Sequence, residues 1–160
     1  MRKWFPGALV LLCLLAAAPA AKAGLIVEGS LGKGARLSPS PAAAEPLNIM
    51  IAPGITFLSI LQAQVGFVWA LPDVQPHKSE VEIRPMLSIS PPLFPLYGRL
   101  IFGFTHLVDG PREVSIGAAG GLKFGVGPVG LFGELGVLPR SFDKTTQWVM
   151  EVRGGVSLSF

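Results

Sequence analysis

The chain is poor in charge, in cysteine and, beyond its first segment, in long hydrophobic runs. Only 14% of its 160 residues are charged, against roughly a quarter in average soluble domains. The sequence contains no block of basic residues of the kind that binds nucleic acids. Its low charge and positive mean hydropathy disfavour disorder. After Gly24 no run of 18 apolar residues occurs, which argues against membrane-spanning helices. The composition fits a membrane protein without membrane helices, or a very apolar secreted protein.

The first segment has the pattern of an export signal. The basic pair Arg2-Lys3 precedes an apolar run over residues 7–20, and Ala21-Lys22-Ala23 places small residues where a signal peptidase reads them. The alternative is a membrane anchor, but the run is shorter than the roughly 20 residues that a spanning helix needs. We therefore predict that residues 1–23 are a cleaved signal peptide and that residues 24–160 form one domain.

Removal of that segment changes the charge and the thiol content of the chain. Arg2, Lys3 and Lys22 leave with it, so ten of the 13 basic residues remain and balance the ten acidic residues. Cys13, the one cysteine, lies in the middle of the apolar run and away from the cleavage site, unlike the cysteine of a lipoprotein. The predicted mature chain is neutral and has neither disulfides nor thiol chemistry.

The mature chain alternates between apolar residues and small or polar residues with a period of two, which is typical of strands with two different faces. In the clearest segments the apolar face carries no charged, hydroxyl or amide side chain. These segments are 47–57, 61–71, 81–89, 114–126 and 148–160, and three weaker strands are expected at 25–34, 96–106 and 129–138.

The connections between these strands alternate in length. The short ones are Ser59-Ile60, Pro91–Pro95 and Gly127-Pro128, and the longer polar ones are Ser38–Pro46, Pro72–Glu80, Leu107–Glu113 and Pro139–Thr146. Eight strands of about ten residues, joined in this way, predict an all-β fold, an eight-stranded antiparallel up-and-down transmembrane β-barrel. Closure leaves no strand edge unpaired, which permits strands to cross lipid.

Two prolines, Pro53 and Pro85, lie within predicted strands although proline cannot donate a ladder hydrogen bond. Each is expected to mark a bulge or a local opening.

The side-chain volumes indicate which face of the barrel points outward. The rival fold is a secreted soluble barrel of the lipocalin kind, with the apolar face inside. An eight-stranded barrel has an interior just wide enough for side chains to fill, so the many large apolar residues do not fit there. Aromatic residues also gather near the predicted strand ends, as in the two aromatic belts of membrane barrels. They are Trp69, Phe104 and Trp148 at the long-loop ends, and Phe57, Phe94, Tyr97, Phe124 and Phe160 at the short-turn ends.

On this pattern the chain resembles the small outer-membrane barrels of Gram-negative bacteria, the class of OmpX and the OmpA membrane domain. The sharpest element is the last strand, whose alternating Val156, Leu158 and Phe160 look like the signal that the family's barrel-assembly machinery reads. The resemblance implies an outer-membrane location, both termini and the short turns in the periplasm, and the long loops outside the cell.

On this topology eight charges fall on inward-facing strand positions, four acidic and four basic: Glu28, Glu82, Arg84, Arg99, Lys123, Glu134, Glu151 and Arg153. Charges in a narrow interior are costly unless they are paired. The balance predicts a salt-bridge network that fills the lumen and supports folding, with a gate for small ions as the alternative. The other twelve lie on or beside the long loops. Their basic members are possible lipopolysaccharide contacts, against the alternative of a solvated surface: Lys33, Arg36, Lys78, Arg112, Arg140 and Lys144.

No catalytic constellation is found. His106 is expected at the outer end of its strand without a serine two residues away, and His77 lies in a polar loop without a recognisable spacing. Two isolated histidines give no metal site, and the glycines of 117–130 lack the lysine of a phosphate loop. We predict no enzyme, no cofactor and no metal.

We expect a monomer in outer-membrane lipid and lipopolysaccharide, with a structural or interaction role: membrane integrity, lipopolysaccharide contact or surface recognition through the short loops. No nucleic-acid partner is expected, and an extracellular partner bound through the loops is a further alternative. A narrow gated pore or small-ligand conduit is the alternative, and an outer-leaflet lipid hydrolase using His106 is a weaker one.

Overall fold

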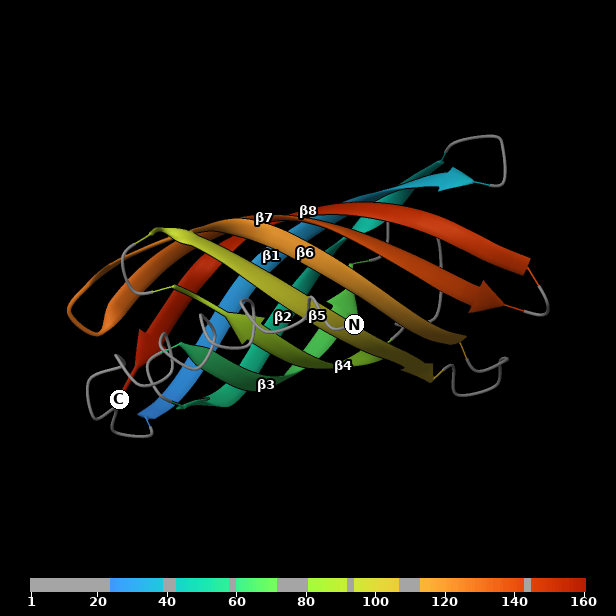
Figure 1. Cartoon of the computed structure of the whole chain (residues 1–160). Coiled ribbons are helices and arrows are strands. Elements are labelled where there is room, and N and C mark those ends of the chain that lie inside the picture. Colours follow the sequence, from blue (N-terminus) through green and yellow to red (C-terminus); the bar gives the residue numbers. More distant parts are fainter. Residues whose placement is uncertain are drawn as a thin grey trace, which may run out of the picture.

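The computed structural model of the chain is a closed barrel of eight antiparallel strands, each paired with its sequence neighbours, and β1 with β8 (Figure 1). It describes residues 24–38, 43–57, 60–71, 81–91, 94–106, 113–142 and 145–160, and at some strand ends the backbone alone. Among these residues, no helix is long and apolar enough to cross a membrane. The predicted fold class and all eight expected strands are confirmed. The strands are β1 Gly24–Ser38, β2 Ala43–Phe57, β3 Leu61–Ala70, β4 Val81–Ile89, β5 Leu96–His106, β6 Glu113–Val126, β7 Val129–Phe142 and β8 Thr145–Ser159.

The short turns lie at one end of the barrel together with the start of β1 and the C-terminus (Figure 1). The β6–β7 turn is Gly127-Pro128, where Gly127 has a φ of 61°, a conformation that favours glycine because it has no Cβ. Leu25 and Phe160 exchange backbone hydrogen bonds of 3.1 and 2.9 Å, which fasten the last strand to the first. We call this end of the barrel the short-turn end and the opposite one the loop end.

Four strands extend further toward the loop end than the alternation indicates, namely β1, β2, β7 and β8. The predicted loops Ser38–Pro46 and Pro139–Thr146 therefore shrink to residues 39–42 and 143–144. The full length of β2 and β7 was not predicted from the sequence, because Pro46 and Pro139 interrupt the alternating pattern. In the structure both strands continue past these prolines.

At Pro46 the strand continues through a β-bulge. Lys33 pairs with Leu47 and Ala35 with Ala44, so Glu45 and Pro46 together lie opposite Gly34. A bulge re-aims side chains, and here Glu45 and Pro46 both line the same interior cavity.

Pro53, Pro85 and Pro139 each lie beside a gap in a ladder. The β2–β3 pairs pass from Ile51–Phe67 to Gly54–Gln64, and the β4–β5 pairs pass from Ile83–Phe104 to Met86–Ile101. The β6–β7 ladder omits two pairs beside Pro139 in the same way. The register is the same on both sides of each gap, so these prolines mark local openings and not bulges. A missing N–H is the physical reason, since proline cannot complete the rung.

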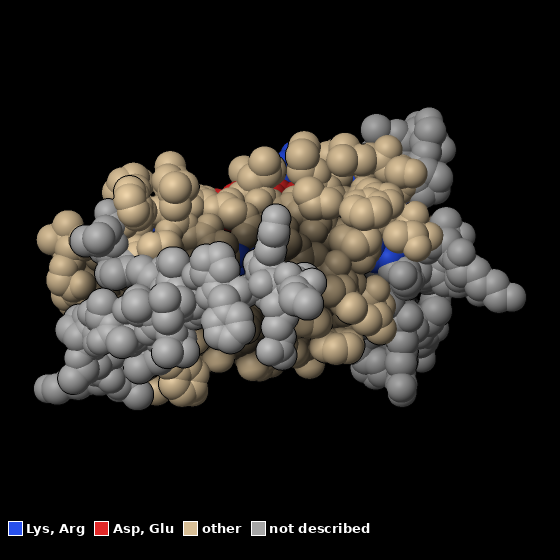
Figure 2. Space-filling model, viewed as in Figure 1, with Lys and Arg blue, Asp and Glu red and all other residues tan. Residues whose placement is uncertain are grey.

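The apolar face of every strand points outward, which confirms the predicted orientation. Exposed side chains include Leu31, Ile51, Phe67, Leu100 and Leu135, with exposed fractions between 37% and 53%. Figure 2 shows one side of this surface, on which few charged atoms are visible among the described residues. Tyr97 departs from the expected aromatic belt: it is 5% exposed and points into the barrel, because its position on β5 has inward parity.

The interior is more apolar at its centre than the sequence pattern suggests. Met50, Ala52, Val68, Met86, Ile101, Ala119 and Leu138 form one buried cluster. Polar and charged side chains fill the lumen beside this cluster, so the described interior is a packed core and not a water-filled tube.

Candidate functional site: the lumen ion-pair chain

Seven strands point charged side chains into the barrel, and these side chains form one continuous series of ion pairs. From the short-turn end to the loop end, acidic and basic groups alternate without exception. We call the series the ion-pair chain: Lys123, Glu28, Arg99, Glu134, Arg153, Glu151, Arg84, Glu82, Arg140, Glu45 and Arg36. Of the twelve charged side chains that the structure describes, only Lys33 lies outside it, on the outward face.

At the short-turn end, Glu28 holds two cations. Its Oε1 lies 2.9 Å from Lys123 Nζ and its Oε2 lies 2.6 Å from Arg99 Nη2. Arg99 also reaches Glu134, with Nη1 at 3.0 Å from Oε2. The Tyr97 hydroxyl donates to the same Oε2 at 2.6 Å, so the carboxylate of Glu134 is shared between a cation and a phenol.

Aromatic faces add to the binding of Arg99. Its guanidinium carbon lies 5.3 Å from the centre of the Tyr97 ring and 5.7 Å from that of Phe132. Both distances are within the range of cation–π attraction. Arg99 is 3% exposed, and the two rings shield it where no further carboxylate is in contact.

Arg153 connects the two halves of the ion-pair chain. Its Nε lies 3.8 Å from Glu134 Oε1, the longest contact in the series, and its Nη2 pairs closely with Glu151. Asn48 and Ser30 accept further hydrogen bonds from the guanidinium at 2.6 and 3.1 Å.

The wall strand β1 leaves space for this cluster at Gly32. A Cβ there would lie 2.7 Å from a Glu151 oxygen and 2.8 Å from both Arg153 Nη2 and Asn48 Oδ1. A larger residue at position 32 would therefore displace these polar groups, so the constraint is their close approach and not the backbone conformation.

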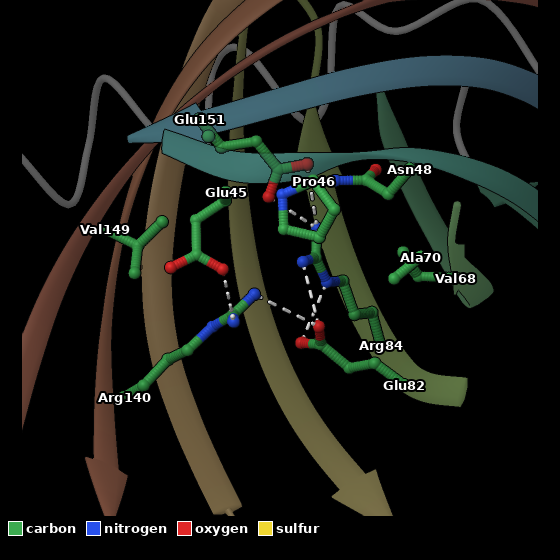
Figure 3. A pocket seen from close by; sticks show the side chains of 11 residues that line it. Glu45, Pro46, Asn48, Val68, Ala70, Glu82, Arg84, Arg140, Val149 and Glu151 are labelled. Atoms are coloured by element: carbon green, nitrogen blue, oxygen red, sulfur yellow. Dashed lines mark hydrogen bonds and ion pairs between the residues drawn. The ribbon is translucent and has the colours of Figure 1, made fainter. Parts of the chain in front are cut away.

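Toward the loop end, Arg84 lies between Glu151 and Glu82, at 2.9 Å from each. Arg140 continues the series with contacts of 3.4 Å to Glu82 and 3.6 Å to Glu45, and Arg36 ends it 3.0 Å from Glu45. Figure 3 shows Arg140 reaching between the two carboxylates, with Arg84 on the far side of Glu82. A cavity of about 50 Å³ remains among these groups.

The packing around the ion-pair chain leaves little free volume. Besides the 50 Å³ cavity near the loop end, a second cavity of about 10 Å³ lies beside Arg84, Glu134, Glu151 and Arg153. A site needs about 10–15 Å³ to hold a water molecule, so the 10 Å³ cavity holds one at most. In the part of the barrel that the structure describes, the lumen is plugged by its own side chains.

Alternation makes every interior member of the ion-pair chain dependent on two neighbours. Burial of a charge is costly, and removal of one partner of a buried pair costs about 3–5 kcal/mol because the other is left uncompensated. Glu28, Arg84, Arg99 and Arg153 are each at most 3% exposed, so water cannot replace a missing partner. The arrangement can hold strands together across the lumen and exclude water; among the described residues, no group of three or more potential metal ligands occurs.

The eight residues predicted for the lumen all face the interior, and the ion-pair chain brings them together. Seven are buried, and Lys123 is partly exposed, with 18% of its side chain accessible. Tyr97, Glu45, Arg36 and Arg140 are members of the site that the sequence reasoning did not include. Arg36 and Arg140 share the even-numbered inward parity of Glu28 and Glu134 on their strands, which is the signal that could have found them.

The residues predicted to contact lipopolysaccharide are divided in the structure. Arg140 lies in the lumen and not on the outer rim, because β7 runs to Phe142 and position 140 has inward parity. Arg36 is bound to Glu45 but keeps 37% of its side chain exposed, and Lys33 is exposed on the outward face of β1. Lys78, Arg112, Lys144, His77 and the side chain of His106 lie outside the described residues.

Comparisons with known proteins agree on the architecture. The sequence matches no protein-family model and no curated protein. Among solved structures, Neisserial surface protein A (NspA) superimposes with a TM-score of 0.61 at 15% identity, covering 88% of this chain and 100% of that chain. The chain has the fold of the small eight-stranded outer-membrane barrels.

Two further solved structures match the chain. A de novo designed transmembrane β-barrel gives a TM-score of 0.55 at 15% identity, over 89% of this chain and 100% of that chain. The N-terminal β-barrel domain of Pseudomonas aeruginosa OprF gives 0.49 at 12% identity, over 87% of this chain and 100% of that chain. The likeness at these identities concerns the fold alone.

Proposed function

We propose that the protein is an integral outer-membrane barrel of a Gram-negative bacterium, with a closed lumen and a structural or interaction role. One observation carries the proposal: among the described side chains, eleven of the twelve charged ones lie in the ion-pair chain inside, while the outward face is apolar. Such an outward face is insoluble in water and matches hydrocarbon. A charged residue on that face costs about 2–4 kcal/mol at mid-membrane and little near the interface, which fits Lys33 in the loop-end half of β1.

Export and assembly belong to the same proposal. Residues 1–23 are the signal, and cleavage before Gly24 leaves a chain that starts at the first residue of β1. Val156, Leu158 and Phe160 are the assembly signal; all three are exposed on the outside of β8 and its end, with Phe160 75% exposed. N-terminal sequencing of the protein from outer membranes tests the cleavage site.

At the loop end, Lys33 and Arg36 bind lipopolysaccharide phosphates in this proposal. Arg36 already pairs with Glu45, so a phosphate would be a second anionic partner for a guanidinium with five donors. Lys33→Gln together with Arg36→Gln is expected to weaken lipopolysaccharide binding without loss of the folded barrel. Equal binding by the double variant and the native protein would remove this part of the proposal.

Membrane insertion and lumen closure can be tested on one preparation. The mature protein folded in detergent is run unboiled and boiled on a gel, and then reconstituted in planar bilayers. We expect a heat-modifiable band and no stable conductance, because the ion-pair chain fills the lumen. Stable single-channel currents from the native protein would contradict a closed lumen and favour the gated pore. A protein that stays soluble without detergent would contradict the membrane location.

The proposal includes no enzymatic activity. Cells that overproduce the protein are expected to show an unchanged lipid A mass spectrum. A new lipid A species that disappears with His106→Ala would overturn this and support the outer-leaflet hydrolase.

A further inference from the structure

The β3–β4 hairpin pairs with β2 on one side and with β5 on the other, and both ladders are interrupted at the same position along the hairpin. Within the hairpin, Val65 pairs with Pro85 and Gly66 with Arg84. The same four residues form no ladder pair with β2 on one side or with β5 on the other. We call the two adjacent gaps, beside Pro53 and Pro85, the proline seam.

An apolar hollow of about 520 Å³ lies on the outside of the barrel at the proline seam. Its lining includes outward-facing residues such as Ile55, Val65 and Phe102, and also Gln64 and Met86, which have inward parity and are each 4% exposed. A hollow bordered by residues of both faces lies against the backbone of the wall. It coincides with the missing ladder pairs, where each proline lacks the N–H that would donate to the neighbouring strand.

The inner side of the proline seam is apolar and deformable. Gly66 leaves space into which two methionines pack: a Cβ at this position would lie 2.9 Å from Met50 Sδ and 3.2 Å from Met86 Cε. Both methionines belong to the buried apolar cluster at the centre of the lumen. Methionine is unbranched and fills irregular space easily, so this floor can adjust to an inserted group.

We propose that the proline seam is a lateral binding site for one hydrocarbon chain of a membrane lipid, which enters from the bilayer and ends against Met86. This inference rests on the proposed membrane location. The apolar walls lie in the outward band that faces lipid, and the volume is within the range of about 300–1,000 Å³ of ligand pockets. A second copy of the chain is a poorer match, because a stable interface buries about 800 Å² of each partner, far more than the lining of this one hollow offers.

The test uses the full mature barrel in nanodiscs that contain a phospholipid with a photoactivatable group at the end of one acyl chain. The heat-modifiable band first establishes that each variant is folded and inserted. After irradiation, labelled positions are mapped by peptide mass spectrometry. We expect several-fold more label at Val65 and Leu87 than at Leu131 and Val156, which pair with each other in the continuous β7–β8 ladder.

Two variants test whether the labelling of Val65 depends on the hollow. Ala63 lies in its lining, beside Ile55 and Leu87 on the neighbouring strands, so Ala63→Leu fills it. The control is Gly29→Leu, on the outward face of β1 with complete ladders on both sides and nothing within 4 Å of an added Cβ. Ala63→Leu is expected to reduce the label at Val65 to the level at Leu131, and Gly29→Leu to leave it unchanged.

Each contrary outcome has a separate meaning. Uniform labelling of all outward positions, or no effect of Ala63→Leu, overturns the lateral site while the membrane location stands. Protection of Val65 in a protein that is dimeric by native mass spectrometry overturns it in favour of an interface between copies. Absence of label from every outward position contradicts the membrane location itself.

Discussion

Two walls of this barrel reach the same closed shape by different means. In the wall formed by β7, β8 and β1, the β7–β8 ladder has 14 consecutive pairs, and the β1–β8 ladder is continuous from Ile26 to Arg36, with one irregularity before Ser38. The β3–β4 wall lacks pairs at the proline seam on both of its sides. It is attached instead across the lumen, where Arg84, in the middle of the seam, pairs with Glu151 on β8 at 2.9 Å. Buried ion pairs thus hold a wall whose own hydrogen bonds are interrupted.

The largest effect is expected from loss of that attachment. Arg84→Ala leaves Glu82 and Glu151 buried without their shared cation, and a loss of about 3–5 kcal/mol in the free energy of unfolding follows. Denaturant titration in detergent, followed by the heat-modifiable band, measures this loss. Hydrogen exchange is expected to increase most in β3 and β4. A loss below about 1 kcal/mol, the level of exposed pairs, would contradict the role of Arg84.

A smaller effect is expected in the continuous wall at Gly32. Gly32→Ala inserts a methyl group where Glu151, Arg153 and Asn48 meet, and such overpacking costs about 1–3 kcal/mol. Gly29→Ala, on the same strand but facing outward into open space, is the matched control and is expected to stay within about 0.5 kcal/mol. If the two variants were equally stable, the close packing of the ion-pair chain against β1 would be disproved.

The smallest effect on global stability is expected from closing the proline seam. Pro85→Val restores an N–H whose net hydrogen-bond contribution is about 0.5–1.5 kcal/mol, while loss of proline costs about 0.4–1 kcal/mol through the unfolded chain. The two nearly cancel in unfolding experiments. Exchange of the Phe102 amide, which faces β4, is nevertheless expected to slow, and exchange in β7–β8 to stay unchanged. Unchanged exchange at Phe102 would show that Pro85 does not cause the gap.

Alternation was sufficient to predict the eight strands and the outward face, because a period of two is a local property. The ends of β1, β2, β7 and β8 were not predictable in the same way. At Glu45-Pro46 the chain bulges, so parity alone gives Glu45 the wrong face. Arg140 has the inward parity of Glu134, but the proline before it reads as a strand end.

The inward position of the eight lumen charges follows from parity, whereas their pairing does not. Which cation meets which carboxylate depends on how neighbouring strands are staggered around the barrel. Glu28 and Lys123, for example, are 95 residues apart in sequence and in contact inside. Tyr97 was assigned to the aromatic belt from its place near a strand end, although its odd number on β5 gives it the parity of Arg99.

The central claim, that the apolar face meets lipid and the ionic face fills the lumen, is tested most directly by tryptophan quenching. Outside the proposed signal segment the chain has Trp69 and Trp148, both outward-facing, 37% and 47% exposed, and near the loop end of their strands. In bilayers of phospholipids brominated along the acyl chain, we expect strong quenching that is greatest for bromines near the headgroup. Aqueous iodide is expected to quench weakly. Strong quenching by iodide with none by brominated lipid would contradict the account.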